Sequence, residues 1–258
     1  MEICVLGSGS GGNATLIKEG RGRAILIDAG LSYLQVGREL KALGIEPQEI
    51  EAILITHEHA DHCCEVGLLA RRLGCPIYGT ERTLRGLGWL LGGLEELRPF
   101  ALGEELEIGG LRIESFPVFH DALEPCGYLI SSGEGTVGLA TDLGVVTRTV
   151  MENLARCDVV ILEANHDLEM LRNGPYPWEL KQRIRSEVGH LSNEACGEAL
   201  TELARRGRLR TAFLAHLSRT NNRPELALET VQSYLNGRID LHLTWQDQRS
   251  ETLSLKCK

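Results

Sequence analysis

The hydrophobic residues of this chain fall into short runs that alternate with glycine-rich or charged segments. Short apolar runs bounded by turn-forming residues are typical of β-strands. The runs predict strands at residues 3–6, 13–18, 23–28, 52–55, 76–78, 111–119, 127–131, 136–140, 158–162 and 211–215.

Between these runs, apolar residues recur at the three- and four-residue intervals of a helix with one buried face. This spacing predicts helices over 33–43, from His62 through Leu73, through Trp89 and Leu91, over 147–155 and 178–188, and after Ser192 up to Gly207. Strand-rich segments alternate with helices in both halves, and no linker or low-complexity stretch interrupts them. We therefore expect a single domain over residues 1–258.

Composition narrows the class of protein. The 258 residues are 43% hydrophobic and 24% charged, which is ordinary for a globular protein. No apolar run is long enough to span a bilayer, and the N-terminus lacks the basic and apolar stretches of a secretion signal. We expect a cytoplasmic protein without membrane contact. The eight cysteines include no C-x-x-C pair, which argues against a zinc-ribbon or redox motif.

Charge is distributed unevenly along the chain. The net charge of -9 argues against general binding of polyanions. Residues 171–223, however, contain ten Lys or Arg and five Glu, an excess of five positive charges that leaves the remainder at -14. If this segment folds near the functional site, it forms a local basic surface on an acidic protein.

The densest chemistry follows the predicted strand 52–55. The segment Thr56-His57-Glu58-His59-Ala60-Asp61-His62 places three histidines and an aspartate within six residues. Imidazole and carboxylate groups are the ligands that suit zinc, manganese and iron. A polar, solvated turn is the alternative, but three of the chain's eight histidines in an H-x-H-x-D-H spacing favour a metal site.

Further candidate ligands also follow predicted strands. All histidines except His242 lie at or just beyond the end of a predicted element, which chance burial would not favour. The candidates beyond the first cluster are His120 with Asp121, Asp142, Glu163 with His166, His190 and His216.

Residues 7–12, Gly-Ser-Gly-Ser-Gly-Gly, match the G-x-G-x-x-G pattern of dinucleotide-binding folds. That fold needs a helix after the glycines, whereas residues 13–18 are strand-like and 19–22 form a turn into the next strand. We favour a strand, a loop and a hairpin over a nucleotide site. Asp28, at the position of a ribose-binding acid, is then a polar residue at a strand end near the metal site.

Residues 56–62, His120, Asp142 and His216, in strand-end order, resemble the metallo-β-lactamase fold hydrolases along essentially the whole chain. The resemblance implies an α/β (α+β) four-layer αββα sandwich of two mixed β-sheets flanked by helices. It also implies two divalent metal ions, zinc or manganese. By this resemblance His57, His59 and His120 hold the first ion, Asp61, His62 and His216 hold the second, and Asp142 bridges them.

Within this superfamily, further segments resemble the YycJ/WalJ-type nucleases, which are related in mechanism to ribonuclease Z. The segments are 7–13, 120–125, 140–144, 163–167, 189–193 and 215–218. The resemblance implies a metal-dependent phosphodiesterase that binds DNA and acts as a 5' to 3' exonuclease, with a role in DNA repair. No extra domain of the ribonuclease J type fits in the chain.

Glu163 and His190 match the positions at which ribonuclease Z-like enzymes pair a glutamate with a histidine. A carboxylate fixes the tautomer of the imidazole and raises its pKa, so that His190 can protonate the leaving alkoxide. The two metals are expected to generate hydroxide from water, oriented by Asp61 or Asp142, for attack on phosphorus. The alternative for His190 is a capping or core histidine.

Substrate contacts are expected in the 7–13 loop, which carries Ser8, Ser10 and Asn13, and at Asn165. The loop could hold a phosphate, although a tight turn with positive φ explains its glycines equally well. Basic residues could contact a polyanion backbone or form solvated helix faces. They are Lys181, Arg183, Arg185, Arg205, Arg206, Arg208, Arg210, Arg219 and Arg223.

Several alternative functions stay open. The Glu163–His190 pair argues against a thioester hydrolase or a lactamase, but it is compatible with a cyclic phosphodiesterase acting on a small phosphoribosyl-type substrate. A di-iron oxidoreductase of this fold would usually carry Glu in place of His59 and an electron-transfer domain. A catalytically silent metal-binding sensor is the alternative from another class, although no proposed ligand is missing.

Overall fold

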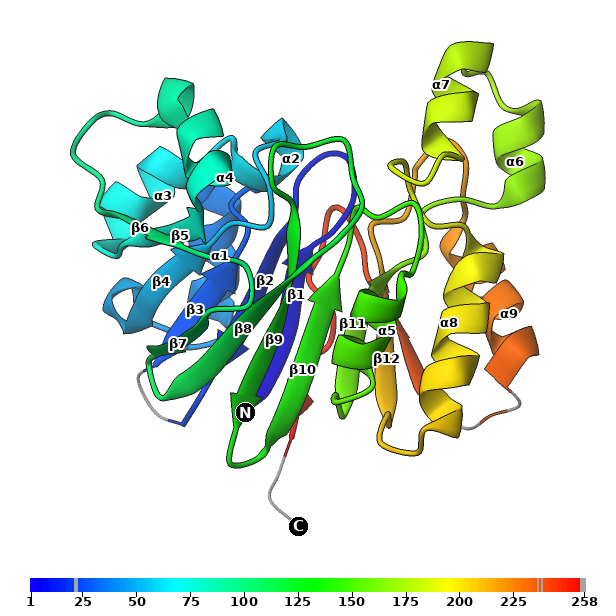
Figure 1. The fold of residues 1–258 in the computed structure, drawn as a ribbon. Coiled ribbons are helices and arrows are strands. Elements are labelled where there is room, and N and C mark those ends of the chain that lie inside the picture. Colours follow the sequence, from blue (N-terminus) through cyan, green and yellow to red (C-terminus); the bar gives the residue numbers. More distant parts are fainter. Residues whose placement is uncertain (21–22, 236, 238, 256–258) are drawn as a thin grey trace.

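Two seven-stranded β-sheets form the middle of the molecule (Figure 1). The computed structural model describes residues 1–20, 23–235, 237 and 239–255. The first sheet has the order β14 (Leu253–Ser254), β1 (Glu2–Gly7), β2 (Ala14–Lys18), β3 (Ala24–Ile27), β4 (Ile50–Leu54), β5 (Ile77–Thr80) and β6 (Leu97–Phe100). The second has the order β13 (Asp240–Leu243), β12 (Thr211–Ala215), β11 (Val159–Glu163), β10 (Gly135–Ala140), β9 (Cys126–Ser132), β8 (Leu111–Pro117) and β7 (Glu105–Ile108).

Both sheets are mixed. Strands β3 to β6 run parallel in the first sheet, as do β10 to β13 in the second, and the other neighbours are antiparallel. Parallel strands end at the same edge of a sheet. Residues that directly follow β3, β4, β10, β11 and β12 are therefore gathered at the carboxyl edges of the two sheets.

Helices cover the outer face of each sheet (Figure 1). The first sheet carries α1 (Tyr33–Ala42), α3 (Val66–Leu73) and α4 (Glu81–Gly86), with the 3-10 turns η1 (Pro47–Glu49) and η2 (Gly88–Leu90) between elements. The second carries α5 (Arg148–Leu154), α8 (Asn193–Arg205) and α9 (Pro224–Leu235). The short helices α2 (Ala60–Cys63), α6 (Leu168–Asn173) and α7 (Trp178–Ile184) lie at the carboxyl edge.

Alternation of side chains along the strands produces the layers. In β1, Ile3 and Val5 face the core between the sheets, while Cys4 faces the helices of the first sheet. In β11, Ile161 faces the central core and Leu162 faces the helices of the second sheet. Strands such as β3, β11 and β12 bury both faces, as their continuous apolar runs require, whereas the edge strands β6, β7 and β13 are partly exposed. This confirms the four-layer αββα sandwich.

Three predicted helices differ from the structure, one of them being 178–188, which ends at Ile184. The helix expected from His62 through Leu73 is interrupted, because α2 ends at Cys63 and α3 begins at Val66. Between them, the Glu65 amide donates to the carbonyl of Ala29 at 3.0 Å, which draws the chain away from a continuous helix. The helix expected through Leu91 ends at Gly86, and a 3-10 turn follows in this glycine-rich stretch.

Other elements lay outside the predictions. The sequence pattern assigned no element to β6, β7, α6, α9, β13 or β14. The Ser192 cap of α8 is confirmed, since its hydroxyl accepts a hydrogen bond from the Ala195 amide at 3.2 Å. Among the described residues, the longest apolar helices fall short of what crossing a lipid bilayer requires.

Candidate metal centre

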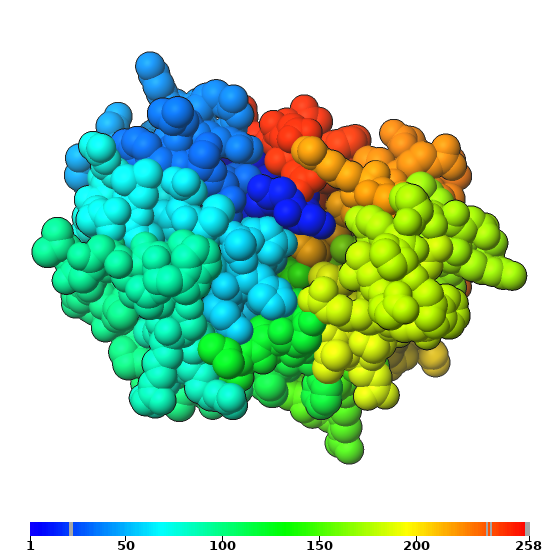
Figure 2. Space-filling view, turned by 90° about the horizontal axis from the view of Figure 1, so that it is seen from above, coloured from blue at the N-terminus to red at the C-terminus, as the bar shows by residue number. Residues whose placement is uncertain are grey.

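Side chains from distant parts of the sequence converge where the parallel strands end. Four overlapping groups of potential ligand atoms each lie within 4.8 Å of one another. They are His57, His59 and His120; Asp61, His62 and His216; His57, His62 and Asp142; and Asp142, Glu163, His190 and His216. From above, the molecule is hollowed at the middle of this face, between surfaces of the two halves (Figure 2).

In the first group, two of the three imidazoles, those of His57 and His120, are oriented by a hydrogen bond on the side away from the cluster. The Thr56 hydroxyl donates to the Asp28 carboxylate at 2.9 Å, so it accepts from Nδ1 of His57 at 3.0 Å. Nδ1 of His120 donates to the carbonyl of Gly189 at 3.1 Å. Both rings therefore keep an unprotonated Nε2, and Nε2 of His57 is buried with no hydrogen-bond partner among the described residues.

Burial also favours the neutral form of His57 and His120. Desolvation lowers the pKa of His57 well below its usual value, and the nearby His62 adds to the effect. Desolvation likewise lowers the pKa of His120, although Asp142 opposes the shift. Neutral imidazole is the form that binds metal ions. The observation of a buried, neutral and unpartnered Nε2 fits a metal ligand.

The second group has carboxylates behind its histidines. Nδ1 of His62 donates to the Asp28 carboxylate at 2.8 Å, and Nδ1 of His216 lies 2.9 Å from Oε1 of Glu163. The Asp61 carboxylate lies between the two Nε2 atoms, 3.6 Å from that of His62 and 3.4 Å from that of His216. Such carboxylate–histidine pairs orient metal-binding rings and increase their basicity.

Asp142 joins the two groups. Its Oδ2 lies 3.1 Å from Nε2 of His62, but the two atoms do not form a hydrogen bond. This buried oxygen therefore has no hydrogen-bond partner among the described residues. Burial opposes ionisation, yet the imidazoles of His216 and His62 outweigh it and hold the pKa of Asp142 well below its usual range. A buried, ionised carboxylate between two imidazole groups fits a shared ligand for divalent metal ions.

Strained backbone marks the same place. Within the described chain, the non-glycine residues with positive φ are Asp28 at 65°, Asp142 at 56° and His216 at 55°. Each lies one or two residues after a parallel strand. Asp142 and His216 belong to the cluster, and Asp28 accepts a hydrogen bond from His62 in it. Left-handed conformations cost about 1 kcal/mol or more and persist where the surroundings enforce them, commonly at functional sites.

Glu163 and His190 lie against the cluster. Oε1 of Glu163 is 2.8 Å from Nδ1 of His190, and its Oε2 accepts the Leu143 and Leu191 amides at 3.0 and 3.1 Å. Burial disfavours a charged His190, but the Glu163 carboxylate overcomes this and raises its pKa. The His190 side chain is 20% exposed, whereas Glu163 is fully buried. The imidazole is thus held on one side and open on the other.

Three of the four polar residues expected to contact substrate make hydrogen bonds within the protein. The Ser8 hydroxyl accepts from the His216 amide at 2.8 Å, and the Asn165 amide donates to the His216 carbonyl at 2.9 Å. The Asn13 side chain lies 3.0 Å from Nε2 of His62. Ser8, Asn13 and Asn165 are all buried, and Ser10 alone is exposed. The buried three position the histidines.

The glycines of the 7–12 loop are explained by close packing. Gly9 and Gly12 have φ of 138° and 147°. A Cβ on Gly11 would lie 2.4 Å from the Gln246 side chain. The next element is the antiparallel strand β2, not a helix, which confirms that the loop does not belong to a dinucleotide-binding fold.

Asp28 is confirmed at a strand end beside the candidate metal site, where it contacts Thr56 and His62. Asp28 directly follows β3, just as the candidate metal ligands follow the other parallel strands. Gly189, which begins one of the segments that resemble the YycJ/WalJ group, and Gly30, which no sequence pattern indicated, are also part of the site. A Cβ on Gly189 would lie 2.2 Å from the Arg183 carbonyl oxygen.

Gly30→Ala is expected to displace Asp61, because the added Cβ would lie 1.7 Å from the Asp61 carbonyl oxygen. We expect a loss of about 1–3 kcal/mol in the free energy of unfolding, together with a lower metal content. Chemical unfolding and elemental analysis measure the two effects. Gly37→Ala in α1 is the matched control, since its Cβ meets no atom within 4 Å. An unchanged stability and metal content in Gly30→Ala would contradict this packing.

The basic residues do not form one surface. Helix α8 starts three residues after His190 and its 13 residues extend about 20 Å, so Arg205, Arg206, Arg208 and Arg210 lie toward the opposite edge of the sheet (Figure 1). A local basic surface was expected only if segment 171–223 folds near the site, and these four residues do not meet that condition. Arg183 pairs with Asp121 at 2.6 Å beside His120.

Comparison with known proteins identifies the family. Residues 23–216 match the family described as Beta-lactamase superfamily domain. Exodeoxyribonuclease WalJ of Streptococcus pneumoniae is 39% identical over 235 residues, covering 90% of this chain and 87% of the relative. The chain belongs to the metallo-β-lactamase superfamily, in the WalJ/YycJ group. Membership of this group makes it a metal-dependent hydrolase.

Two further matches agree with this assignment. Exodeoxyribonuclease YycJ of Bacillus anthracis is 35% identical over 240 residues, which cover 92% of this chain and 90% of the relative. The crystal structure of the metallo-β-lactamase fold protein YhfI from Bacillus subtilis superposes with a TM-score of 0.77 at 16% identity, covering 98% of both chains. The match to YhfI supports the fold alone. The cluster of His and Asp side chains agrees with binding of divalent metal ions.

Proposed function

We propose that this protein is a metal-dependent exodeoxyribonuclease that degrades DNA from a 5' end. The observation that carries the proposal is the hydrogen-bonded pair of Glu163 and His190, placed against the metal-ligand cluster with one face of His190 open. The WalJ and YycJ relatives, both exodeoxyribonucleases by name, support DNA as the substrate. The 5' polarity rests on the resemblance of the sequence to this group.

The cluster offers ligands for two divalent ions, zinc or manganese. His57, His59 and His120 would hold one ion. Asp61, His62 and His216 would hold the other, with Asp142 contributing to both. The donors are all nitrogen and oxygen, which suit both metals. Bound divalent ions activate water and spread the negative charge that builds on phosphoryl oxygens.

Side chains of the protein then orient the attacking water and the metal ligands and supply a proton to the leaving group. The Asp61 carboxylate is 24% exposed at the edge of the cluster and can accept a hydrogen bond from the attacking water. Glu163 fixes Nδ1 of His190 in its protonated form, so Nε2 faces the substrate. Because Glu163 also raises the pKa of His190, the charged imidazolium can give its Nε2 proton to the leaving oxygen, which makes His190 the general acid. Asp28, Ser8 and Asn165 hold the ligands in place.

A panel of substrates tests this function. Apoprotein reloaded with zinc or manganese is incubated with end-labelled DNA and RNA, single- and double-stranded, and with a small cyclic phosphodiester. We expect degradation of linear DNA that a chelator stops. Intact DNA beside hydrolysed cyclic phosphodiester would replace the proposal with a cyclic phosphodiesterase, and protein that binds metal but turns over none of the substrates would make it a sensor.

We further propose that residues 1–258 act as one domain, because a single apolar core with residues from both sheets joins the two halves. The hydroxyl of Tyr128 in β9 donates to the carbonyl of Ile55, which follows β4 in the other sheet, at 2.7 Å. A cytoplasmic location stays a prediction of the sequence.

A further inference from the structure

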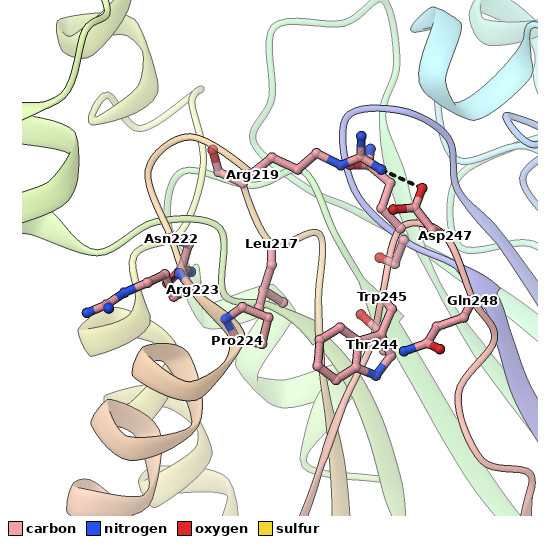
Figure 3. A pocket seen from close by; sticks show the side chains of 12 residues that line it. Leu217, Arg219, Asn222, Arg223, Pro224, Thr244, Trp245, Asp247 and Gln248 are labelled. Carbon is pink, nitrogen blue, oxygen red and sulfur yellow. Dashed lines mark hydrogen bonds and ion pairs between the residues drawn. The ribbon is translucent and has the colours of Figure 1, made fainter.

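A pocket of about 450 Å³ is lined by Leu217, the residue that follows His216 in the chain (Figure 3). Its apolar surface includes Leu217, Pro224 and the half-buried Trp245. Its polar lining includes Arg219 and Arg223. The metal ligands are not part of this lining, and no step proposed above uses the pocket.

The pocket is joined to the candidate metal centre through short connections. Leu217 directly follows His216 in the chain. Ser8 lines the pocket while its hydroxyl accepts from the His216 amide at 2.8 Å. The Ser8 amide in turn donates to the Trp245 carbonyl at 2.8 Å. A chain-like substrate that leaves the metal cluster on this side would reach the pocket directly.

The charges in the pocket favour an anion at its rim. Arg219 pairs with Asp247 at 2.5 Å, and both side chains are more than half exposed. An exposed pair of this kind contributes little to stability, so the guanidinium can exchange partners. Arg223 makes no ion pair within the described part of the chain. Asp247 opposes an anion, but the two arginines leave a net positive charge.

The lining combines an indole, two aliphatic residues and two guanidinium groups in a space large enough for a nucleotide. Proteins that bind single strands without sequence preference use this combination, with aromatic rings for bases and cations for the backbone. We propose that the pocket holds one nucleotide of the DNA strand, with its base on Trp245 and its phosphate on Arg219, while Arg223, which points away from Trp245 (Figure 3), contacts the phosphate of an adjacent nucleotide. This inference rests on the proposed nuclease function.

Binding can be measured without cleavage. The full-length protein is mixed with a fluorescein-labelled single-stranded oligodeoxynucleotide in chelator, and fluorescence anisotropy gives Kd. We expect Trp245→Ala to raise Kd about tenfold, since one stacked base contributes on that scale. Trp245→Phe, which keeps an aromatic face, should stay within about threefold of the wild type. Trp89→Ala is the control, because Trp89 is 72% exposed on η2, far along the chain from the pocket.

Arg223→Gln provides a second test that does not disturb the half-buried indole. It should weaken binding and lower the slope of log Kd against log salt by about one, as expected for one lost phosphate contact. Arg148→Gln on α5, where Arg148 is 91% exposed, should leave the slope unchanged. Thermal unfolding of each variant checks that the fold is intact.

The outcomes separate this inference from the proposed function. Equal Kd for Trp245→Ala and the wild type, or no binding by the wild type in chelator, would overturn the pocket as a nucleotide site, because its contacts need no metal. That result would leave the proposal that the protein degrades linear DNA standing. Conversely, Trp245-dependent binding without any DNA degradation would sink the nuclease proposal and leave the pocket as a nucleic-acid site.

Discussion

Asp142→Asn is expected to remove bound metal and with it all measurable turnover. The substitution keeps the size of the side chain, and asparagine tolerates the positive φ of 56° at this position. It removes a charge that lies 3.1 Å from Nε2 of His62 in the second group and 3.9 Å from Nε2 of His120 in the first. Loss of an outer contact to a metal ligand typically weakens affinity about 10–100-fold, and loss of a ligand itself should exceed that range.

Elemental analysis after dialysis measures this effect directly. Asp121→Asn is the matched control, because Asp121 lies 3.4 Å from His120 but pairs with Arg183 and joins no group of potential ligands. It should keep its metal. Full metal content in Asp142→Asn would contradict the role of Asp142 as a shared ligand.

His190→Ala is expected to lower turnover by about a hundredfold or more while metal content stays at the wild-type level. The reason is that the His190 imidazole belongs to neither of the first two ligand groups and is held by Glu163, with part of its surface exposed. Steady-state kinetics on linear DNA and elemental analysis on the same preparation measure the two quantities.

Imidazole added to His190→Ala should restore part of the lost turnover, which a purely structural role would not allow. His242→Ala is the control, because His242 stacks on Phe213 in β12 away from the cluster and should not affect turnover. Loss of metal from His190→Ala would instead make His190 a ligand, consistent with its place in the group with Asp142, Glu163 and His216.

The strand-end pattern explains why much of the site could be predicted. His57, Asp142 and His216 each follow a parallel strand, and parallel strands in the same sheet end at one edge. The strand-end pattern places Asp142 and His216 at one edge of the second sheet and His57 at an edge of the first, whereas the resemblance to the metallo-β-lactamase fold implied that these edges meet in one site. Asp28 could be placed near the site for the same reason, since it follows β3.

Features that depend on three-dimensional packing could not be predicted in this way. Ser8, Asn13 and Asn165 are polar loop residues, and nothing in their sequence distinguishes a substrate contact from a support for His216 or His62. The position of Arg205 depends on the direction of α8, which carries it away from the site. The Trp245 pocket forms from a segment in which apolar spacing assigned no element.

The most direct test of the central claim compares linear DNA with a covalently closed circle of the same sequence. Metal-loaded protein should release nucleotides from the linear form and leave the circle intact, because an exonuclease needs an end, and chelator should stop the reaction. Cutting of the closed circle, or an intact linear form with metal bound, would contradict the assignment as a metal-dependent exodeoxyribonuclease.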